Sequence, residues 1–515
     1  MLQKIRLIFA GTSDFAVPSL QILAQQPDFE ILQVLTPQDQ PAGRQRQLRA
    51  PPVKIFAKQA ELPLRQITGF DSAVCQELQQ FQPDFLVVVA LRFRVPREIL
   101  ALPKFGCVNL HASLLPKFRG AAPITAAILA GEQVTGVSFQ QMAEGLDTGP
   151  LWAKFQIPLA QTETKEALMQ KLAQLGATQF PAVLRQIKNR TVKAQVQNEA
   201  QASFCTKLTK NTGYADFQQT SAPELLAKLR ALGDWPGVWT VFQKQVLKLQ
   251  DFQEAEIKKL PADLQPGQVF AADQRIYVAL QQGALELKTV QLAGKKPLAI
   301  QDFVRGQPAL LGSQLGYPAC KQLLLATSNP SKIKEITTGL QSLNLALKTP
   351  QDFALQKFPV ESGTTFQANA RIKAEFFQRL THLPVLADDS GILVQAFPGK
   401  FGVHTARAFG PNLTDAEWLQ EFLTKMQGAQ TRRAKFVCVL ALAYPDLPTQ
   451  FFRGAVQGEI LSEAAAPLLP GIPLSSVFRP FGSEQVFAAL TPTEKSRFSH
   501  RGLALKKLAE FLQHS

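Results

Sequence analysis

Apolar and polar positions alternate in different ways along successive parts of the chain. From Ile5 to about Lys188, short apolar runs alternate with longer amphipathic stretches. This pattern predicts parallel strands that are covered by helices on both faces. The expected strands cover residues 5–11, 29–36, 85–90 and 107–113, and the expected helices cover residues 19–26, 53–62, 73–81, 124–131 and 164–188.

A second pattern of shorter strands follows between residues 207 and 312. A helix expected at 222–232 precedes five alternating segments that are separated by Gly, Pro and Asp. Closely spaced short strands of this kind predict a small antiparallel barrel. The polar stretch 189–206 and the turn-forming stretch 313–320 are predicted to be linkers. The expected strands cover residues 238–243, 245–252, 267–272, 276–283 and 284–292.

The strand and helix pattern restarts at Lys321 and continues to about residue 512. Strands and amphipathic helices are mixed here, which predicts a third, mixed α/β domain. The expected strands cover residues 322–327, 383–388, 434–444 and 451–460, and the expected helices cover residues 333–343, 368–380, 417–426 and 500–513.

Composition and charge narrow the functional classes. The 515 residues are 46% hydrophobic and 18% charged, which is ordinary globular usage. No apolar run reaches the ~18–20 residues that cross a bilayer, and we see no signal peptide. The five cysteines lack a CxxC pair, so we expect a cytoplasmic protein without a disulfide scaffold, a zinc ribbon or a membrane partner. The formal charge of +15 either aids solubility or indicates a polyanionic partner, such as RNA or nucleotides.

An amide, an imidazole and a carboxylate form the first candidate site. Asn109 and His111 lie two residues apart on an expected strand, so their side chains share one face. Asp147 follows in the glycine-flanked sequence GLDTG. Such a set suits acyl transfer to an amine, in which Asn stabilises an oxyanion, His moves a proton and Asp stabilises the His. Taken singly, a loop Asn or Asp is more often a turn former and a single His is more often structural.

Longer sequence motifs around these residues favour the catalytic interpretation over the structural one. FAGTSDFAVPSL, PAGR, VNLHASLLPKFRGAAPI and GVSFQQMAEGLDTG occur in this order, followed by WPGVWT and DFVRGQ. With them, residues 1–312 resemble methionyl-tRNA formyltransferase. The resemblance implies a Rossmann-like parallel-sheet catalytic domain at 1–188, an OB-like tRNA-binding barrel at 207–312, and formyl transfer from 10-formyltetrahydrofolate to methionyl-initiator-tRNA. It implies formyl-transfer roles for Asn109, His111 and Asp147, and a folate site at Ser113, Leu114, Leu115 and Pro116.

Basic residues supply a candidate tRNA surface. The sequence QDQPAGRQRQLRAPPVK resembles the loop of this family that contacts the acceptor stem, most closely at Arg44. Clustered arginines on a Gly/Pro-rich loop suit phosphate contacts, although a charge run alone is more often a solvated face. The candidate tRNA-binding residues are Arg44, Arg46 and Lys207, and Arg49, Lys54 and Lys210 could extend the surface.

One segment of the first domain departs from that family. Where relatives carry an apolar run with a Tyr-Gly pair beside the folate pocket, this chain has Leu91, Arg92, Phe93 and Arg94. The two arginines could reach the glutamate tail of the donor or could obstruct its pterin. A formyltransferase for an amino sugar nucleotide is the alternative enzyme, because the same Asn-His-Asp chemistry serves other amines.

Three motifs carry the chemistry of the third domain. ATSNPSK (326–332) lies between a strand and a helix, where Ser328, Ser331, Lys332 and backbone N–H groups could cradle phosphate, although such a turn is more often a helix cap. ADDSG (387–391) places two carboxylates at a strand end, where they could hold magnesium or activate water. SHRG (499–502) adds cationic groups.

These motifs, with ESGTTFQANARIKA and GKFGVHTAR, make residues 321–512 resemble the inosine/xanthosine triphosphate pyrophosphatase family. The resemblance implies hydrolysis of noncanonical purine nucleoside triphosphates (ITP, XTP, dITP) to a monophosphate and pyrophosphate. It implies Mg²⁺ held by Glu361 and Asp389, Asp389 as general base, and a homodimer through this C-terminal domain. It implies nucleotide contacts from Thr327, Ser328, Asn329, Ser331, Lys332, Ser390, Lys495, His500 and Arg501.

The third domain also departs from its family. Relatives grip the purine with a Gly-Phe-Gly-(Tyr/Trp)-Asp-Pro segment, whereas this chain has GIPLSSVF (471–478). Ala368 replaces a family glutamate. Stacking needs an aromatic or apolar platform, which Leu474 and Ser475 supply poorly. The alternative is therefore an active formyltransferase fused to a degenerate module that binds nucleotide or is inactive.

Overall fold

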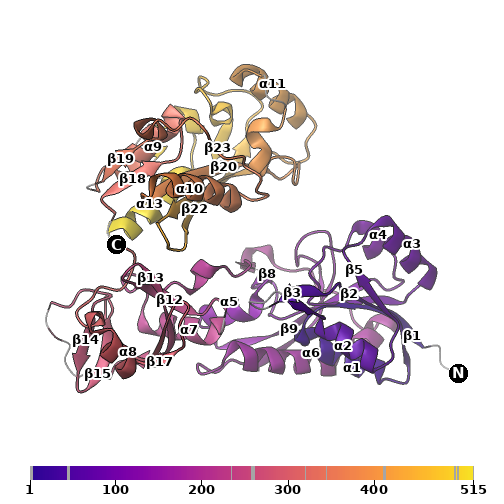
Figure 1. Cartoon of the computed structure of the whole chain (residues 1–515). Helices are drawn as coiled ribbons and strands as arrows, with labels where there is room; N and C mark the ends of the chain where they lie inside the picture. The colour runs from indigo at the N-terminus through magenta and orange to yellow at the C-terminus, as the bar shows by residue number, and fades with distance from the viewer. Residues whose placement is uncertain are drawn as a thin grey trace.

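Three sheets in succession organise the chain, as the computed structural model shows (Figure 1). The structure describes residues 4–42, 47–233, 235–256, 261, 263–318, 320–343, 345–409, 413–491, 494–495 and 498–513. We call the part that contains the second sheet the central domain (residues 207–312) and the part that contains the third sheet the C-terminal domain (residues 321–512). The predicted α/β fold class, with a parallel-sheet domain followed by two further sheet domains, is confirmed.

The first sheet has seven strands in the order β10-β9-β7-β6-β1-β2-β5. Strands β5, β2, β1, β6 and β7 are parallel, and their apolar runs are buried because helices cover the sheet. The sequence pattern did not predict β9 and β10, which add an antiparallel edge to this sheet. The strands are β1 (Ile5–Gly11), β2 (Phe29–Pro37), β5 (Leu64–Ile67), β6 (Phe85–Val89), β7 (Cys107–His111), β9 (Val134–Gln141) and β10 (Leu151–Pro158).

Six helices accompany this sheet, and the longest of them carries an apolar face with ten buried residues. This helix, α6, packs along α1 and closes the first domain, as its amphipathic pattern predicts. Two small strand pairs lie outside the main sheet. The helices are α1 (Val17–Ala24), α2 (Pro52–Gln59), α3 (Ser72–Phe81), α4 (Arg97–Leu100), α5 (Pro123–Leu129) and α6 (Lys165–Lys188), and the small strands are β3 (Gln40–Ala42), β4 (Gln47–Arg49), β8 (Arg119–Gly120) and β11 (Phe204–Cys205).

The central domain holds a six-stranded antiparallel sheet. Its strand order is β12-β13-β16-β15-β14, with β17 paired to β16, and all five predicted strands are present. Apolar residues of these strands and of two helices form one core. The elements are α7 (Ala222–Leu232), β12 (Val238–Phe242), β13 (Gln245–Glu254), β14 (Val269–Ala272), β15 (Arg275–Ala279), β16 (Ala284–Leu292), β17 (Leu298–Ala299) and α8 (Ile300–Gly306).

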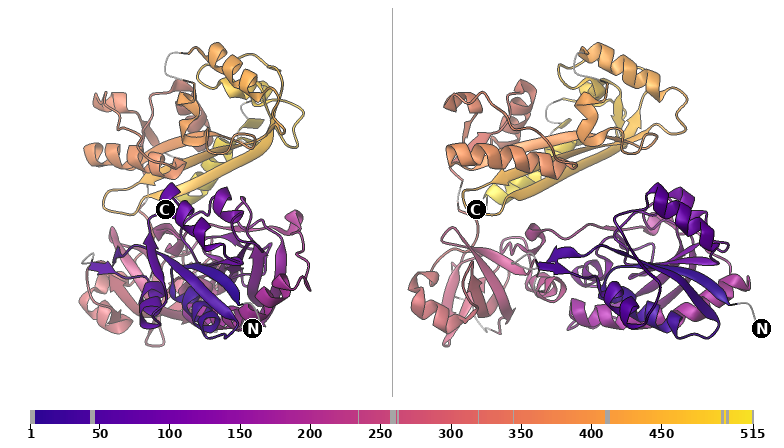
Figure 2. Two further views of the ribbon diagram at one scale, coloured as in Figure 1. Left: turned by 90° about the vertical axis from the view of Figure 1, so that its right-hand side faces the viewer. Right: turned by 45° about the vertical axis from the view of Figure 1, so that its right-hand side comes forward.

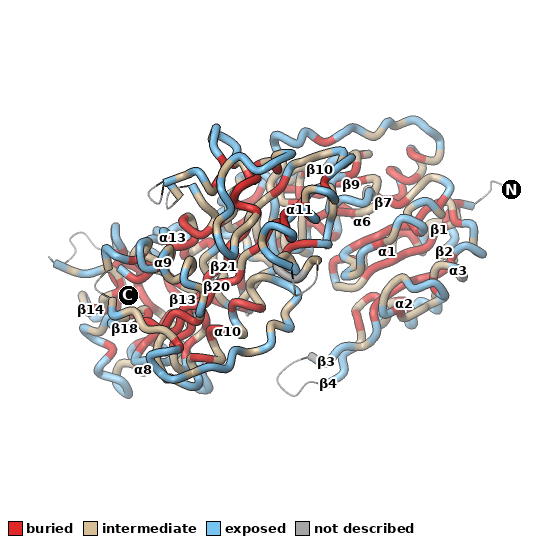
Figure 3. Tube along the Cα trace, turned by 90° about the horizontal axis from the view of Figure 1, so that it is seen from above, coloured by how far each residue is buried: buried red, intermediate tan, exposed pale blue. Residues whose placement is uncertain are grey.

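The C-terminal domain holds a mixed sheet in the order β19-β18-β20-β21-β22-β23. Strands β19, β18 and β20 are parallel, and the other pairs are antiparallel. Buried residues run along β20 and β21 in the core of this part (Figure 3). The elements are β18 (Gln322–Leu325), α9 (Pro330–Leu340), β19 (Ala346–Lys348), α10 (Phe366–Thr381), β20 (Val385–Val394), α11 (Asp415–Met426), β21 (Arg433–Ala443), β22 (Gln450–Ile460), β23 (Phe478–Pro480) and α13 (His500–Gln513).

An aromatic interface joins the central and C-terminal domains, which meet where the C-terminus lies beside the central domain (Figure 2). Tyr317 comes from the segment that the turn residues predicted to be a linker, yet it is buried, and its ring contacts the rings of Tyr214 and Tyr444. The Tyr317 hydroxyl donates to the carbonyl of Pro448 at 2.6 Å and accepts from the Gln450 amide at 2.5 Å. The two domains therefore share one core rather than a flexible connection.

We expect the substitution Tyr317→Phe to destabilise the C-terminal domain. It leaves the buried Gln450 amide and the Pro448 carbonyl without the hydroxyl, and an unsatisfied buried polar group costs ~1–3 kcal/mol. For a domain of this size, that loss corresponds to a fall of about 2–12 °C in the unfolding midpoint, measured by calorimetry. Tyr277→Phe is the matched control, because Tyr277 stacks on Phe270 within the central domain. Equal midpoints for both variants would contradict a shared core.

Candidate functional site

The catalytic residues predicted in the first domain come together at the end of β7. Asp147 Oδ2 lies 3.7 Å from Nδ1 of His111, and Nε2 of His111 lies 3.0 Å from the carbonyl oxygen of Phe118. Asn109 lies two residues before His111 on β7, and its partner in the register of β9 is Gln140, whose amide donates to the Asp147 carboxylate. One edge of the sheet therefore presents an amide, an imidazole and a carboxylate together.

The Asp147 carboxylate is held in place by two hydrogen bonds. The Gly120 N–H donates to Oδ2 at 2.9 Å, and the Gln140 amide donates to Oδ1 at 2.8 Å. Asp147 has a φ of 52°, a left-handed conformation that Asp adopts more readily than most residues. These contacts leave the carboxylate facing His111, where it can stabilise an imidazolium.

The four predicted folate-site residues form a turn beside this edge. The Ser113 hydroxyl donates to the Lys117 carbonyl at 2.6 Å, and Leu115 is fully buried with its N–H on the Ser138 hydroxyl. The Ser113 side chain and the Leu115 backbone N–H therefore hold the turn. Leu114 and Pro116 are only partly buried.

The arginines that depart from the family pattern lie on the surface near this edge. Arg94 donates to the carbonyl oxygen of Glu144 at 3.4 Å, in the loop that leads to Asp147. Arg92 lies over the Phe93 ring at 5.7 Å from its centroid. Both are exposed, so either can contact an anionic ligand at the rim.

The predicted tRNA-binding residues are only partly described. Arg44 and Arg46 lie outside the described residues, whereas Arg49 and Lys207 are exposed. Lys54 is held by Asp39 at 2.7 Å, so this lysine is already paired.

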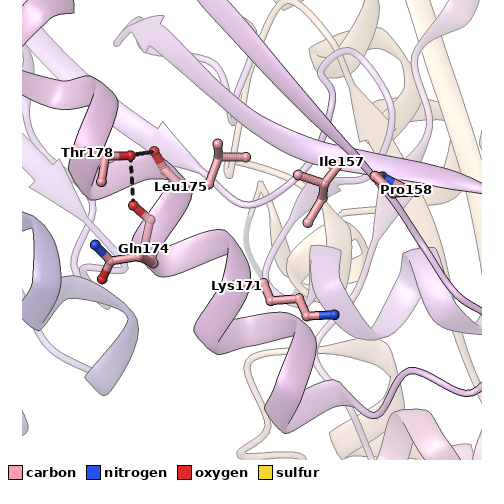
Figure 4. Close-up of a pocket in the computed structure, with 6 residues that line it drawn as sticks. All are labelled: Ile157, Pro158, Lys171, Gln174, Leu175 and Thr178. Carbon is pink, nitrogen blue, oxygen red and sulfur yellow. Dashed lines mark hydrogen bonds between the residues drawn. The ribbon is translucent and has the colours of Figure 1, made fainter.

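Lysines also line a groove between the central and C-terminal domains. Lys210, Lys244 and Lys248 lie on one wall of this groove, which has a volume of about 580 Å³, and the loop 446–448 forms the other wall. The sequence pattern did not predict this groove, because its two walls are about 200 residues apart in the chain. A second cavity of about 480 Å³, between β10 and α6, is lined mainly by apolar atoms, and its Lys171 is paired with Glu163 (Figure 4). That cavity holds none of the predicted site residues.

A buried charge cluster occupies the predicted site of the C-terminal domain. Asp388 on β20 accepts from Lys332 at 3.0 Å and from Arg501 at 3.2 Å. Burial alone would raise the pKa of Asp388, but Lys332 and Arg501 lower it, and the net pKa lies below the usual range. Arg501 also donates to Ser390 at 3.1 Å and pairs with Glu335. The sequence indicated both carboxylates of ADDSG but did not assign a role to Asp388.

Asp389 has a different environment from its neighbour. Burial raises its pKa to about 6, against the opposing effect of Lys373. Lys373 Nζ lies 3.1 Å from Glu361 and 3.7 Å from Asp389, so it joins the two carboxylates that were predicted to bind metal. Sequence reasoning missed Lys373, although it lies within the ANARIKA motif.

The other predicted nucleotide contacts take several roles. Asn329 caps α9, because its side chain accepts from the N–H groups of Ser331 and Lys332, and the helix-cap interpretation therefore describes this turn. The His500 ring stacks on Phe436 with centroids 4.9 Å apart, and burial lowers its pKa to about 3, so it is neutral. Thr327, Ser328 and Lys495 are partly or fully exposed, and burial lowers the pKa of Lys495.

The GIPLSSVF segment offers little for recognition of a base. The Ser475 hydroxyl donates to the Ile472 carbonyl at 2.7 Å, and the Ser476 hydroxyl donates to the Pro473 carbonyl at 2.8 Å. Leu474 is buried. Both hydroxyls are therefore engaged within the segment itself.

Three family descriptions match successive parts of the chain. The family described as formyl transferase matches residues 3–184, its C-terminal domain matches residues 207–308, and the Ham1 family matches residues 323–511. Methionyl-tRNA formyltransferase of Marinobacter nauticus is 37% identical over 315 residues, which is 60% of this chain and 100% of the relative. The enzyme of that name from Hydrogenovibrio crunogenus is 36% identical over 318 residues, 61% of this chain and 100% of the relative.

Two solved structures are similar to parts of this chain. A HAM1 protein from Coxiella burnetii is 34% identical, with 38% of this chain and 100% of that chain covered and a TM-score of 0.35. HypX from Aquifex aeolicus in complex with tetrahydrofolic acid is 16% identical, with 59% of this chain and 47% of that chain covered and a TM-score of 0.40.

The family matches over residues 3–184 and 207–308 define a formyl transferase, which is followed by a Ham1-family domain. The chain belongs to the methionyl-tRNA formyltransferase family over its first 60% and carries a Ham1-family domain in the remainder. Among the described residues, no helix is long and apolar enough to cross a membrane. The described part of the chain also contains no group of three or more His, Cys, Asp or Glu side chains placed to hold a metal ion.

Proposed function

We propose that residues 1–312 transfer the formyl group of 10-formyltetrahydrofolate to the amino group of methionyl-initiator-tRNA. The observation that carries this proposal is the pairing of Asp147 with His111 at 3.7 Å, two residues from Asn109, in a part of the chain that is 37% identical over 315 residues to a methionyl-tRNA formyltransferase. The test is formylation of methionyl-initiator-tRNA by the purified chain. Transfer to an amino sugar nucleotide instead would overturn it.

The three residues divide the chemistry of acyl transfer. The amino nitrogen attacks the formyl carbon, and the Asn109 amide donates to the oxygen on which negative charge develops. His111 takes the proton from the attacking nitrogen and returns it to the departing N10 of the donor, as the new C–N bond forms and the old one breaks. Asp147 stabilises the imidazolium between these two steps.

The tRNA is proposed to contact the exposed basic residues of the loop 40–54 and of the central domain. Lys207 and Lys210 are exposed, and the groove beside Lys210 carries two further lysines. Phosphate contacts release counterions, so affinity falls as salt rises.

We expect Lys210→Ala to weaken tRNA binding and to reduce its dependence on salt. Removing one phosphate contact lowers the slope of log affinity against log salt by about 1. Binding is measured by filter retention of methionyl-tRNA at several salt concentrations. Lys171→Ala is the control, because Lys171 lies on α6 of the first domain and is paired with Glu163. An unchanged slope for Lys210→Ala would exclude this lysine from the tRNA surface.

For the C-terminal domain we propose hydrolysis of noncanonical purine nucleoside triphosphates to monophosphate and pyrophosphate. The Ham1-family match and the cluster of Lys332 and Arg501 around Asp388, next to Asp389, support this proposal. Lys332, Lys495 and Arg501 provide positive charge for the phosphates, and Asp389 is the proposed base for the attacking water.

The residues present fit one divalent cation. Asp389 Oδ2 is buried and accepts no hydrogen bond, and Glu361 lies across Lys373 from it. Mg²⁺ is usually held by one or two carboxylates together with substrate phosphates, and two are available here. Glu361 and Asp389 would hold it, and it would neutralise charge on the phosphates.

A second candidate is a domain that binds nucleotide without hydrolysing it. The engaged hydroxyls of Ser475 and Ser476 favour it, because the segment has no free side-chain donor for a base. The test that distinguishes the enzyme from the binding domain is pyrophosphate release in the presence of Mg²⁺, in which ITP, XTP and dITP are compared with ATP and GTP. Preference for the first three nucleotides supports the enzyme, and absence of release beside intact formylation supports the second candidate.

A further inference from the structure

A buried network from the segment after α6 reaches the loop that carries Asp147. Gln197 is 6% exposed, although it lies in a polar stretch that was predicted to be a linker. Its amide nitrogen donates to the carbonyl oxygen of Asp147 at 2.8 Å and to that of Gly149 at 2.6 Å. One side chain therefore ties down the backbone on both sides of Thr148.

The orientation of the Gln197 amide is fixed by a buried arginine. Arg119 is 1% exposed, and its Nε and Nη2 both donate to the Gln197 side-chain oxygen, at 3.1 and 2.8 Å. Because arginine only donates, the oxygen must face Arg119 and the NH₂ group must face the loop. Glu199 pairs with the outer side of the guanidinium at 2.7 Å and holds it in turn.

Asp147 needs such a restraint. Its left-handed φ of 52° is costly for a residue other than glycine and persists only where the surroundings impose it. The backbone carbonyl held by Gln197 belongs to the same residue whose carboxylate faces His111. A small displacement of that carboxylate from the imidazole costs much of the rate.

We propose that Gln197 is a positioning residue for formyl transfer, which fixes Asp147 against His111 through the backbone of the loop. Arg119 acts through Gln197. This inference rests on the proposed formyltransferase activity, and it assigns a role in the reaction to the stretch between the first two domains.

The substitution Gln197→Glu tests the proposal with almost no change in shape. The carboxylate still accepts from Arg119, but it cannot donate to the carbonyls of Asp147 and Gly149 and repels them. We expect kcat for formylation to fall about 10–100-fold, with KM for both substrates within about twofold. Gln195→Glu makes the same change at an exposed side chain two residues earlier and keeps wild-type rates.

A double substitution distinguishes positioning from a general loss of structure. If Gln197 acts through Asp147, then Gln197→Glu adds little loss to a chain that already carries Asp147→Asn. A double variant whose loss of kcat equals the product of the two single losses would overturn the proposal. An unchanged kcat in Gln197→Glu would overturn it as well.

Hydrogen exchange gives a readout that does not depend on activity. We expect faster amide exchange in residues 142–150 of Gln197→Glu than in the wild type or Gln195→Glu. A wild type that does not formylate methionyl-tRNA would refute the proposed function alone, whereas unchanged exchange in this loop would refute the positioning role.

Discussion

The substitution Asp147→Asn is expected to abolish most formylation while the chain stays folded. Asn keeps a similar shape and accepts the left-handed backbone, but it cannot stabilise a charged His111. Loss of such a carboxylate from an imidazole lowers kcat on the order of 10²–10⁴-fold. The measurement is the rate of formylation of methionyl-initiator-tRNA at saturating donor.

The control for this prediction is Asp28→Asn. Asp28 pairs with Arg185 on the surface of the same domain, and both side chains are 40% exposed. We expect this variant to formylate at the wild-type rate. The substitutions Asn109→Ala and His111→Ala should also abolish transfer without unfolding the chain. Full activity in Asp147→Asn would remove this carboxylate from the reaction.

Much of the fold is predictable from the periodicity of apolar positions. The runs that form β1, β6 and β7 are buried on both faces, and such runs are distinctive in a sequence. Strand β9 was missed because its buried run includes the polar residues Thr135, Ser138 and Gln140. Strand β10 was missed because it alternates between half-buried and exposed positions and lies at the sheet edge.

The candidate sites were predictable only where recognisable sequence motifs carry them. Asn109, His111 and Asp147 stand in such motifs, and the structure brings them together. Gln197 and Lys373 were missed because a long polar side chain in a polar stretch has no pattern that reveals its burial. The interdomain core was missed for a related reason, since Tyr317 lies among turn-forming residues. The predicted homodimer stays a prediction.

The adjacent carboxylates Asp388 and Asp389 are expected to respond in opposite ways to the same substitution. Asp388 is 2% exposed, and its lowered pKa shows that the folded protein stabilises its charged form. That stabilisation is present above the ordinary pKa of about 3.8 and is lost as the pH falls below it. Asp389 has a pKa raised to about 6, so the folded protein disfavours its charge at neutral pH.

Asp388→Asn should therefore lower stability, and Asp389→Asn should lower activity. The first change leaves the buried Arg501 and the half-buried Lys332 without their shared carboxylate, which typically costs about 3–5 kcal/mol. The second removes a charge that the fold disfavours, so the unfolding midpoint should hold or rise while pyrophosphate release from ITP is lost. Calorimetry on both variants tests the predicted stabilities, and pyrophosphate release from both variants tests the predicted activities. Hydrolysis that survives in Asp389→Asn would require another base, and a stable Asp388→Asn would mean that Glu335 alone neutralises Arg501.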